Sequence, residues 1–478
     1  MIDRDLAREI LQATLGRGGD SAELYAERTF STTLRLDGRR LEEAASGVDR
    51  GVGLSLVDRE RTLYANGNRI EREALMRMAE RLARAQGSSA QPTPSGGPGA
   101  PAESAGPSLP SVTFRESPLH LVSPVLVPPR GVPVEKKVEA LRRADAAARA
   151  HDARVTQVTA FYRDTEQQVL VADSDGTWGA ETRQYISIFV TAVARQGDDI
   201  RTGSESRSET RGFEFFDVNL PEDVGREAAR LAAQQLAAVP APAGTFTVVL
   251  SSKAGGTMVH EACGHGLEAD FIAKSLSVYA GKIGQQVASR LITVVDDGTL
   301  PNLRGSSAMD DEGIGTTRAV LIEKGILKGF LHSRKTARAM GAAPTGHGRR
   351  ESYRHLPLPR MRNTIILPGD TPAEAIVAGV REGILVCRMG GGEVDVATGN
   401  FVFHCSEAYM IRGGKVAEPI RDATLIGNGP EVMSGIDKVG SDLGYGVGTC
   451  GKEGQGVPVA DAQPTLRIPS ITVGGVVS

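Results

Sequence analysis

Apolar and polar residues follow two different periods in the first half of the chain. Leu75, Met78, Ala79 and Leu82 recur at the spacing of one helical face and predict a helix over residues 71–86. The same period predicts helices over residues 3–15 and 133–152. Alternating apolar and polar residues predict antiparallel strands over 22–36, 51–57, 61–65, 155–162, 167–172 and 185–195. Asp175-Gly176 is a turn signal before the last of these strands.

The second half of the chain is richer in predicted strands. Pro221 begins an Ala-rich helix that runs to about residue 239, and a buried strand follows over 245–250. Further strands are predicted over 291–295, 318–323, 363–367, 383–387, 400–412, 465–468 and 470–473. The predicted fold class is therefore α+β, with an N-terminal helix and antiparallel-sheet region followed by a β-rich domain.

A Pro/Gly/Ser/Ala-rich stretch interrupts the first half at residues 87–110. Its composition predicts a flexible surface loop without regular structure. The chain is long enough for two or three domains. We place an N-terminal α+β region at 1–218 and a C-terminal domain at 219–478, because the antiparallel block ends near Phe216.

Composition and charge exclude several classes of function. Lys and Arg total 55 against 58 Asp and Glu, for a net charge of -3, which argues against a nucleic-acid binder and a polybasic membrane surface. The four cysteines are too few and scattered for a disulfide framework. The first residues predict a charged amphipathic helix rather than a signal peptide, and no apolar run approaches a membrane span. We expect a cytoplasmic protein.

The candidate chemistry begins at His260-Glu261-Ala262-Cys263-Gly264-His265. Two imidazoles can bind a Zn²⁺ ion, and the Glu261 carboxylate can take a proton from a water that the metal activates. The histidines are five residues apart, so a regular helix would separate them by roughly 140° around its axis. Both reach one metal only if the helix bends or ends between them. Gly264 and Gly266 predict such a bend, since glycine breaks a helix or adopts the left-handed conformation at low steric cost.

A zinc hydrolase needs a third protein ligand and one open coordination position. The candidates are Cys263, Glu268, Cys387, His404, Cys405 and Cys450. Cys263 would point away from the histidines on a helix, while Cys387 and Cys405 lie in apolar strands where packed thiols are common. Cys450 leads because it lies between Gly448 and Gly451, in a predicted loop that leaves room around the sulfur. Lys452 nearby could favour the thiolate.

Three segments resemble the TldD/PmbA family of metalloproteases, specifically its TldD-type, metal-bearing subunit. They are MVHEACGHGLEAD, PTGHGRRESYRHLPLPRMRNT and GTCGKEGQGVPV, in that order, and the likeness extends to the terminal segment DAQPTLRI. The resemblance implies one Zn²⁺ per active subunit, held by His260, His265 and Cys450, with Glu261 as the general base. It also implies unfolded or short peptides as substrates, and a homodimer or a heterodimer with a PmbA/TldE-type subunit that encloses the site.

Three points stay open from the sequence. A peptide-binding or chaperone-like module with a structural metal is the alternative to a peptidase, and an amidase would share the same machinery. The arginines of residues 344–364 could bind a substrate carboxylate or form ion pairs within a loop. Tyr353, His355 and His332 are possible oxyanion stabilisers, among which the sequence does not choose.

Overall fold

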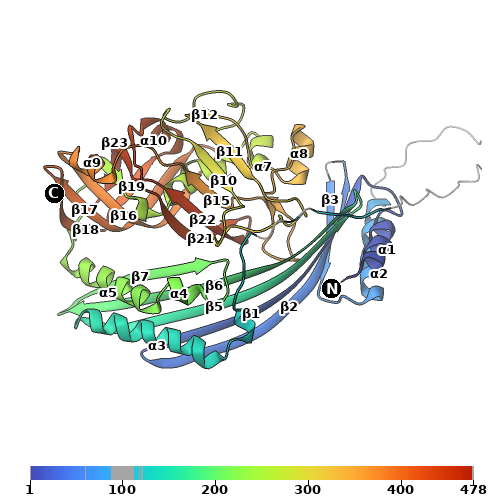
Figure 1. The fold of residues 1–478 in the computed structure, drawn as a ribbon. Helices are drawn as coiled ribbons and strands as arrows, with labels where there is room; N and C mark the ends of the chain where they lie inside the picture. The colour runs from blue at the N-terminus through green and yellow to red at the C-terminus, as the bar shows by residue number, and fades with distance from the viewer. Residues whose placement is uncertain (1, 60, 88–111, 118, 120–121, 476–478) are drawn as a thin grey trace, which may run out of the picture.

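Two sheet systems, one from each half of the chain, form the framework of the protein (Figure 1). The structure is a computed structural model, and it describes residues 2–59, 61–87, 112–117, 119 and 122–475. The long strands of the N-terminal sheet curve along one side of the C-terminal half (Figure 1). None of the described helices is both long and apolar enough to span a bilayer.

The N-terminal sheet has the strand order β3-β2-β1-β5-β6-β4, and β7 pairs with the same edge of β6 as β4 does, farther along that strand. Its long central strands are antiparallel, and their register pairs Leu24 with Ala172 and Leu34 with Tyr162, all buried. The strands are β1 (Ser21–Asp37), β2 (Arg40–Asp58), β3 (Arg61–Gly67), β4 (Arg115–Glu116), β5 (Val155–Asp173), β6 (Thr177–Gln196) and β7 (Asp199–Glu209).

Helices cover this sheet in two groups, each with its own apolar core. Apolar residues of α1 (Arg4–Thr14) and α2 (Arg72–Gly87) form one core with β1 and β2. A second core joins β5 and β6 to α3 (Val134–His151), α4 (Phe215–Val218) and α5 (Pro221–Ala237). At the α3–α5 crossing, a Cβ added to Gly225 would lie 2.1 Å from the carbonyl oxygen of Ala144. Only glycine permits this approach.

Gly225→Ala should therefore destabilise the protein by about 1–3 kcal/mol, as overpacking typically does. The obstructing atom belongs to the backbone of α3, so a rotamer change cannot relieve the clash. Thermal unfolding would measure the loss. Gly435→Ala, also at a helical glycine but with no atom near the added Cβ, is the matched control and should be neutral or stabilising. Equal stability of the two variants would contradict the packing.

The C-terminal half contains a closed barrel and a second sheet. Strands β16, β9, β23, β19 and β17 pair in that order, and β16 also pairs with β17, which closes the ring. The second sheet has the order β12-β11-β10-β15-β22-β21, so β21 is an edge strand. The barrel strands are β9 (Gly244–Leu250), β16 (Glu382–Val394), β17 (Asn400–Arg412), β19 (Thr424–Asn428) and β23 (Leu466–Gly474).

Most of the remaining strands belong to these two sheets, and one short pair forms a sheet of its own. The second sheet contains β10 (Val294–Asp297), β11 (Arg318–Glu323), β12 (Ile326–Leu327), β15 (Asn363–Ile366), β21 (Gly444–Lys452) and β22 (Gln455–Gln463). The barrel sheet also includes β8 (Val239–Pro240), β18 (Lys415–Arg421) and β20 (Lys438–Val439), while β13 (Gly348–Arg349) and β14 (Leu358–Pro359) pair only with each other. The helices of this half are short: α6 (Thr257–Val259), α7 (Ala269–Ala273), α8 (Arg334–Met340), α9 (Ala373–Ala378) and α10 (Gly429–Gly435).

The α+β fold class is confirmed, with corrections in detail. Residues 155–162 and 167–172 belong to one continuous strand, β5, because the polar residues between them pair with β1 on one side and β6 on the other. The two predicted tail strands are likewise one strand, β23, with a register shift between Ile468 and Ile471. Strands β7, β18, β19, β21 and β22 were not predicted.

The domain division at 218/219 stays a prediction. Val224, Ala228, Ala229 and Ala232 of α5 are buried in the core of the N-terminal sheet, so this helix packs with the N-terminal half. We propose that the division follows α5 rather than preceding it. The predicted flexible loop at 87–110 lies outside the described residues, apart from Gly87 at the end of α2.

Candidate metal centre

The histidine motif follows barrel strand β9 and contains one turn of π-helix. After the single turn of α6, residues His260–Gly264 form the π-helical turn, and the backbone N–H of His265 donates to the carbonyl oxygen of His260. This i→i+5 bond places residues five apart on the same face. The predicted bend is therefore a π-helical turn, and it brings the imidazole centroids of His260 and His265 to 5.0 Å.

Gly264 acts differently from the sequence-based expectation. Its φ of -55° is ordinary right-handed helix, so the left-handed conformation is not used. A Cβ at this position would instead lie 2.1 Å from the Met361 sulfur. The glycine is needed because the motif packs closely against the segment 344–364, a contact that the local sequence does not reveal.

Cys450 reaches the histidines from β21 rather than from a loop. β21 and β22 form a hairpin whose turn residues Glu453 and Gly454 both have positive φ, 48° and 73°. Two central residues with positive φ are typical of the tight turns that match strand twist. The glycines around Cys450 thus lie in a strand, and Cys450 is paired opposite Val457.

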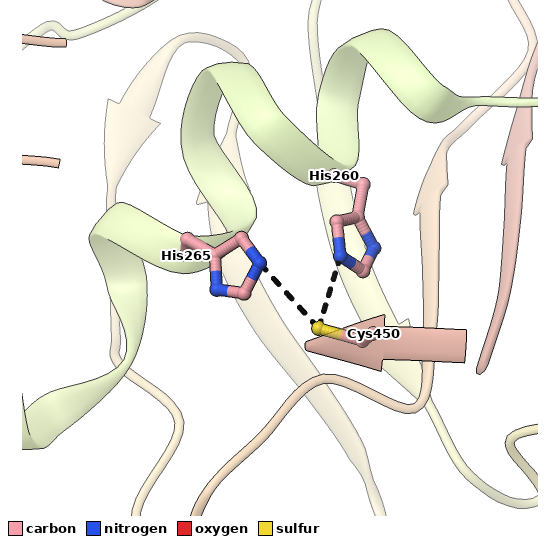
Figure 2. Close-up of side chains that lie close together, drawn as sticks. All are labelled: His260, His265 and Cys450. Atoms are coloured by element: carbon pink, nitrogen blue, oxygen red, sulfur yellow. Dashed lines mark hydrogen bonds between the residues drawn. The ribbon is translucent and has the colours of Figure 1, made fainter. Parts of the chain in front are cut away.

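The three side chains converge on one point (Figure 2). The Cys450 sulfur lies 3.2 Å from His260 Nε2 and 3.4 Å from His265 Nε2. Zn–N and Zn–S bonds of ordinary length at a tetrahedral angle would put nitrogen and sulfur about 3.6 Å apart. Their donor atoms all lie within 4.8 Å of one another, and this set could hold a metal ion. The residues present therefore fit a zinc ion in both chemistry and spacing.

Each imidazole is oriented by a buried carboxylate on its far side. His260 Nδ1 lies 2.9 Å from Asp461 Oδ1, and His265 Nδ1 lies 3.1 Å from Glu268 Oε2. Such a partner sets the tautomer in which Nε2 presents its lone pair. Glu268, a candidate ligand from sequence, thus lies behind His265 rather than beside the sulfur. Asp461 carried no sequence signal, since it is 201 residues from its histidine.

Charges in the cluster favour a thiolate at Cys450. Burial opposes ionisation, but hydrogen bonds to His260 and His265 and the charges of both histidines outweigh it and lower the thiol pKa to about 5. Burial also opposes protonation of His265, yet Glu268 and Cys450 raise its pKa to about 10. Lys452 was expected to favour the thiolate, but its ammonium group pairs with Glu268 and Asp270. A metal cation would replace the Nε2 proton of each imidazole.

The cluster opens into a cavity of about 1920 Å³. Glu261 lines the cavity beside the two histidines, and burial raises the pKa of its carboxyl. Two edge strands line the cavity as well, β21 of the C-terminal half and β7 of the N-terminal sheet. The cavity exceeds the ~300–1,000 Å³ of ordinary small-molecule pockets. It can hold several residues of an extended chain.

The other cysteines and the remaining candidate ligand lie elsewhere. The Cys263 thiol donates to the carbonyl of Val259, and burial raises its pKa to about 12. Cys387, Cys405 and His404 belong to the barrel strands β16 and β17. Among the described residues, the set of donors close enough to share a metal comprises only His260, His265 and Cys450.

The arginines of 344–364 form contacts within the protein. Arg349, Arg360 and Arg362 are buried and donate to backbone carbonyls, while exposed Arg354 pairs with Asp49. This favours the second interpretation, a loop held by its own contacts. Within the described chain, neither these residues nor the suggested oxyanion stabilisers Tyr353, His355 and His332 line the cavity.

Comparison with known proteins identifies the family to which this site belongs. The three domains described for the PmbA/TldA metallopeptidases match in order: domain 1 at residues 22–85, the central domain at 127–236 and the C-terminal domain at 243–475. The chain belongs to the TldD/PmbA family. The resemblance noted from the three sequence segments is thereby confirmed, and the protein is a metallopeptidase of this family.

Relatives and a solved structure agree with this TldD/PmbA assignment. A metalloprotease TldD homolog of Haemophilus influenzae is 39% identical, over 96% of this chain and 94% of its own length. A zinc metalloprotease TldD homolog of Saccharolobus solfataricus is 31% identical, over 66% of this chain and 69% of its own. The crystal structure of TldE from Thermococcus kodakarensis shares the fold, with a TM-score of 0.75 at 18% identity, over 98% of this chain and all of that one.

Proposed function

We propose that the protein is a zinc-dependent peptidase in which His260, His265 and Cys450 bind the metal and Glu261 is the general base. The observation that carries this proposal is the convergence of Nε2, Nε2 and Sγ beside Glu261 in one cavity. Three protein ligands with a fourth position open distinguish catalytic zinc sites from closed structural ones. The name of the Saccharolobus solfataricus relative supports zinc as the metal.

Bound zinc would polarise the scissile carbonyl and lower the pKa of the attacking water. The Glu261 carboxylate takes the proton of that water and then delivers it to the leaving amine. Its raised pKa suits both steps, because a base whose pKa lies closer to neutrality also returns the proton readily. Asp461 and Glu268 keep the Nε2 atoms of the histidines aimed at the metal position.

We propose unfolded or short peptides as the substrates. β21 pairs with β22 alone among the described strands, so its other edge presents free backbone groups to the cavity. Residues 202–209 of the edge strand β7 line the same cavity. An extended peptide that adds to a sheet edge gains affinity from its main chain, with little dependence on its side chains.

The alternative, a peptide-binding module with a structural metal, is less well supported. A closed site would need a fourth protein donor beside the first three. Within the described parts of the chain, the cluster contains three donors, and the carboxylates of Asp461 and Glu268 are engaged with the far side of the imidazoles. Glu261 also lines the cavity, where a purely structural site would not require a carboxylate.

We propose that the chain works as a dimer, with a second copy or with a TldE-type subunit. The fold likeness to a TldE supports such a pairing, because the two kinds of chain share one architecture. The cytoplasmic location stays a prediction.

Metal content tests the proposed ligands. His260→Ala, His265→Ala and Cys450→Ala should each lose most of the bound zinc and, with it, cleavage of an unfolded peptide. Cys263→Ala is the matched control, since its thiol is buried and bonded to the helix backbone, and it should keep both. Elemental analysis of each purified variant measures the effect. Full zinc in Cys450→Ala, or loss of zinc in Cys263→Ala, would overturn the assignment.

A further inference from the structure

A buried network of charged groups lies behind the histidine–cysteine cluster. At its centre is Glu268, which is fully buried and whose Oε2 lies 3.1 Å from His265 Nδ1 and 3.0 Å from Lys452 Nζ. The Arg360 guanidinium, also fully buried, approaches the other carboxylate oxygen, with its Nε 3.8 Å from Glu268 Oε1. Neither of these two facing atoms has a hydrogen-bond partner. The two atoms face each other, while Lys452 and His265 contact the Oε2 atom of the same carboxylate.

Arg360 also holds the strand that carries Cys450. Its Nη2 donates to the Cys450 carbonyl oxygen at 2.5 Å, and its Nη1 donates to the carbonyl of Gln455 at 3.3 Å. The guanidinium therefore contacts both strands of the β21–β22 hairpin. The backbone N–H of Arg360 is itself fixed by the carbonyl of His347, at 2.9 Å. One side chain thus joins the support of His265 to the backbone of Cys450.

The carboxylate behind His260 has no equivalent cationic partner. Asp461, the partner of His260, forms no ion pair with Lys or Arg among the described residues. Glu268, by contrast, lies within ion-pair distance of both Lys452 and Arg360. The two imidazoles are thus oriented by carboxylates in unequal electrostatic surroundings.

We propose that Arg360 is a positioning residue that fixes His265 and Cys450 relative to each other before a metal binds. Glu268 holds His265 with Nε2 toward the sulfur, and Arg360 faces the other oxygen of this carboxylate, which needs a partner because it is buried away from water. The planar guanidinium supplies several donors in a fixed geometry, so it can contact the carboxylate and two carbonyls at once. The proposal rests on the metal ligands proposed above.

Metal affinity of Arg360 variants is the test. Arg360→Met keeps the length of the side chain but removes its charge and donors, and it should raise the Kd for Zn²⁺ by about 10–100-fold, the usual effect of losing an outer partner. Arg360→Lys keeps the positive charge but lacks the planar set of guanidinium donors. Its Kd for Zn²⁺ should lie between those of Arg360→Met and the unaltered protein. Competition with a chromophoric chelator measures the affinity. Arg354→Met, in the same segment but exposed and paired with Asp49, is the control and should bind zinc normally.

A spectroscopic measurement separates positioning from general stability. With Co²⁺ in place of zinc, Arg360→Met should change the sulfur-to-cobalt charge-transfer band, because Cys450 moves relative to His265. A lowered melting temperature of the metal-free protein with unchanged zinc affinity and cobalt spectrum would mean a merely structural arginine and would overturn the proposal. If Arg360→Met does not fold, Glu268→Gln, nearly isosteric, decides by the same two measurements.

A double substitution tests whether Arg360 acts through Glu268. In Arg360→Met/Glu268→Gln, the loss of zinc affinity should be smaller than the product of the two single losses, since the residues share one function. Independent, multiplicative losses would contradict the proposed connection. Absence of zinc from the His260, His265 and Cys450 cluster in the unaltered protein would overturn the proposed function together with this role. Normal zinc binding by Arg360→Met would overturn this role alone.

Discussion

Glu261→Gln should keep the metal and the fold but reduce cleavage of an unfolded peptide by about 10²–10⁴-fold or more. The substitution is nearly isosteric and removes the proton acceptor beside the proposed zinc ligands. Because the Glu261 side chain forms no hydrogen bond or ion pair with any described residue, stability should change little. The steady-state rate on a fluorogenic peptide, with zinc content measured on the same sample, is the required pair of data.

Glu393→Gln provides the control for this experiment. Glu393 also lines the cavity but is exposed and belongs to β16, away from the π-helical turn. Its substitution removes the same charge from the cavity without removing the proposed base. A similar drop in both variants would mean that general electrostatics, rather than proton transfer at Glu261, controls the rate. Near-normal turnover by Glu261→Gln would exclude its role as general base.

The parts of the fold with regular apolar patterns could be predicted from the sequence. Strands β11 and β17 match the predicted ranges 318–323 and 400–412, because β17 alternates buried and exposed residues over most of its length and β11 buries the apolar pair Leu321 and Ile322. The edge strands β7 and β21 were missed for the opposite reason. Their sequences, DIRTGSESRSE and GYGVGTCGK, are polar or glycine-rich, and they line the cavity rather than a core. An edge strand beside a binding cavity has little apolar periodicity to detect.

The candidate site, too, could be predicted only in part from the sequence. The spacing of His260 and His265 predicted a helical irregularity, because only such a backbone brings residues five apart to one face. The tertiary partners could not be predicted locally: Met361 against Gly264, Asp461 behind His260, and Arg360 on the Cys450 carbonyl. Each of these contacts depends on the packing of a distant strand or loop against the π-helical turn. The mistaken loop at Cys450 arose because glycine is common both in turns and at strand edges that ligands approach.

The largest effect is expected in the cleavage rates of folded and unfolded substrates. We expect the protein to cleave an unfolded chain at least about 10³-fold faster than the same chain in its native state. A domain with an unfolding free energy of about 7 kcal/mol is globally unfolded in only about one molecule in 10⁵. Local opening exposes some segments more often than this, so we expect a smaller ratio between the two cleavage rates. The cavity of about 1920 Å³ adds a steric limit. A folded domain of 100 residues has a radius of gyration of about 13 Å, and a sphere of that radius has several times the volume of the cavity.

The comparison should avoid denaturant, which would unfold the peptidase as well. A stable two-state domain and a core variant of it that is unfolded in the same buffer provide matched substrates. Adding an unstructured tail to the stable domain is the internal control: cleavage should then occur within the tail and stop at the fold, because the edge of β21 can pair only with extended backbone. Equal cleavage of the native and unfolded chains would exclude selection for extended segments. It would leave the proposed metal chemistry intact, since the ligands and Glu261 act on any peptide bond that reaches them.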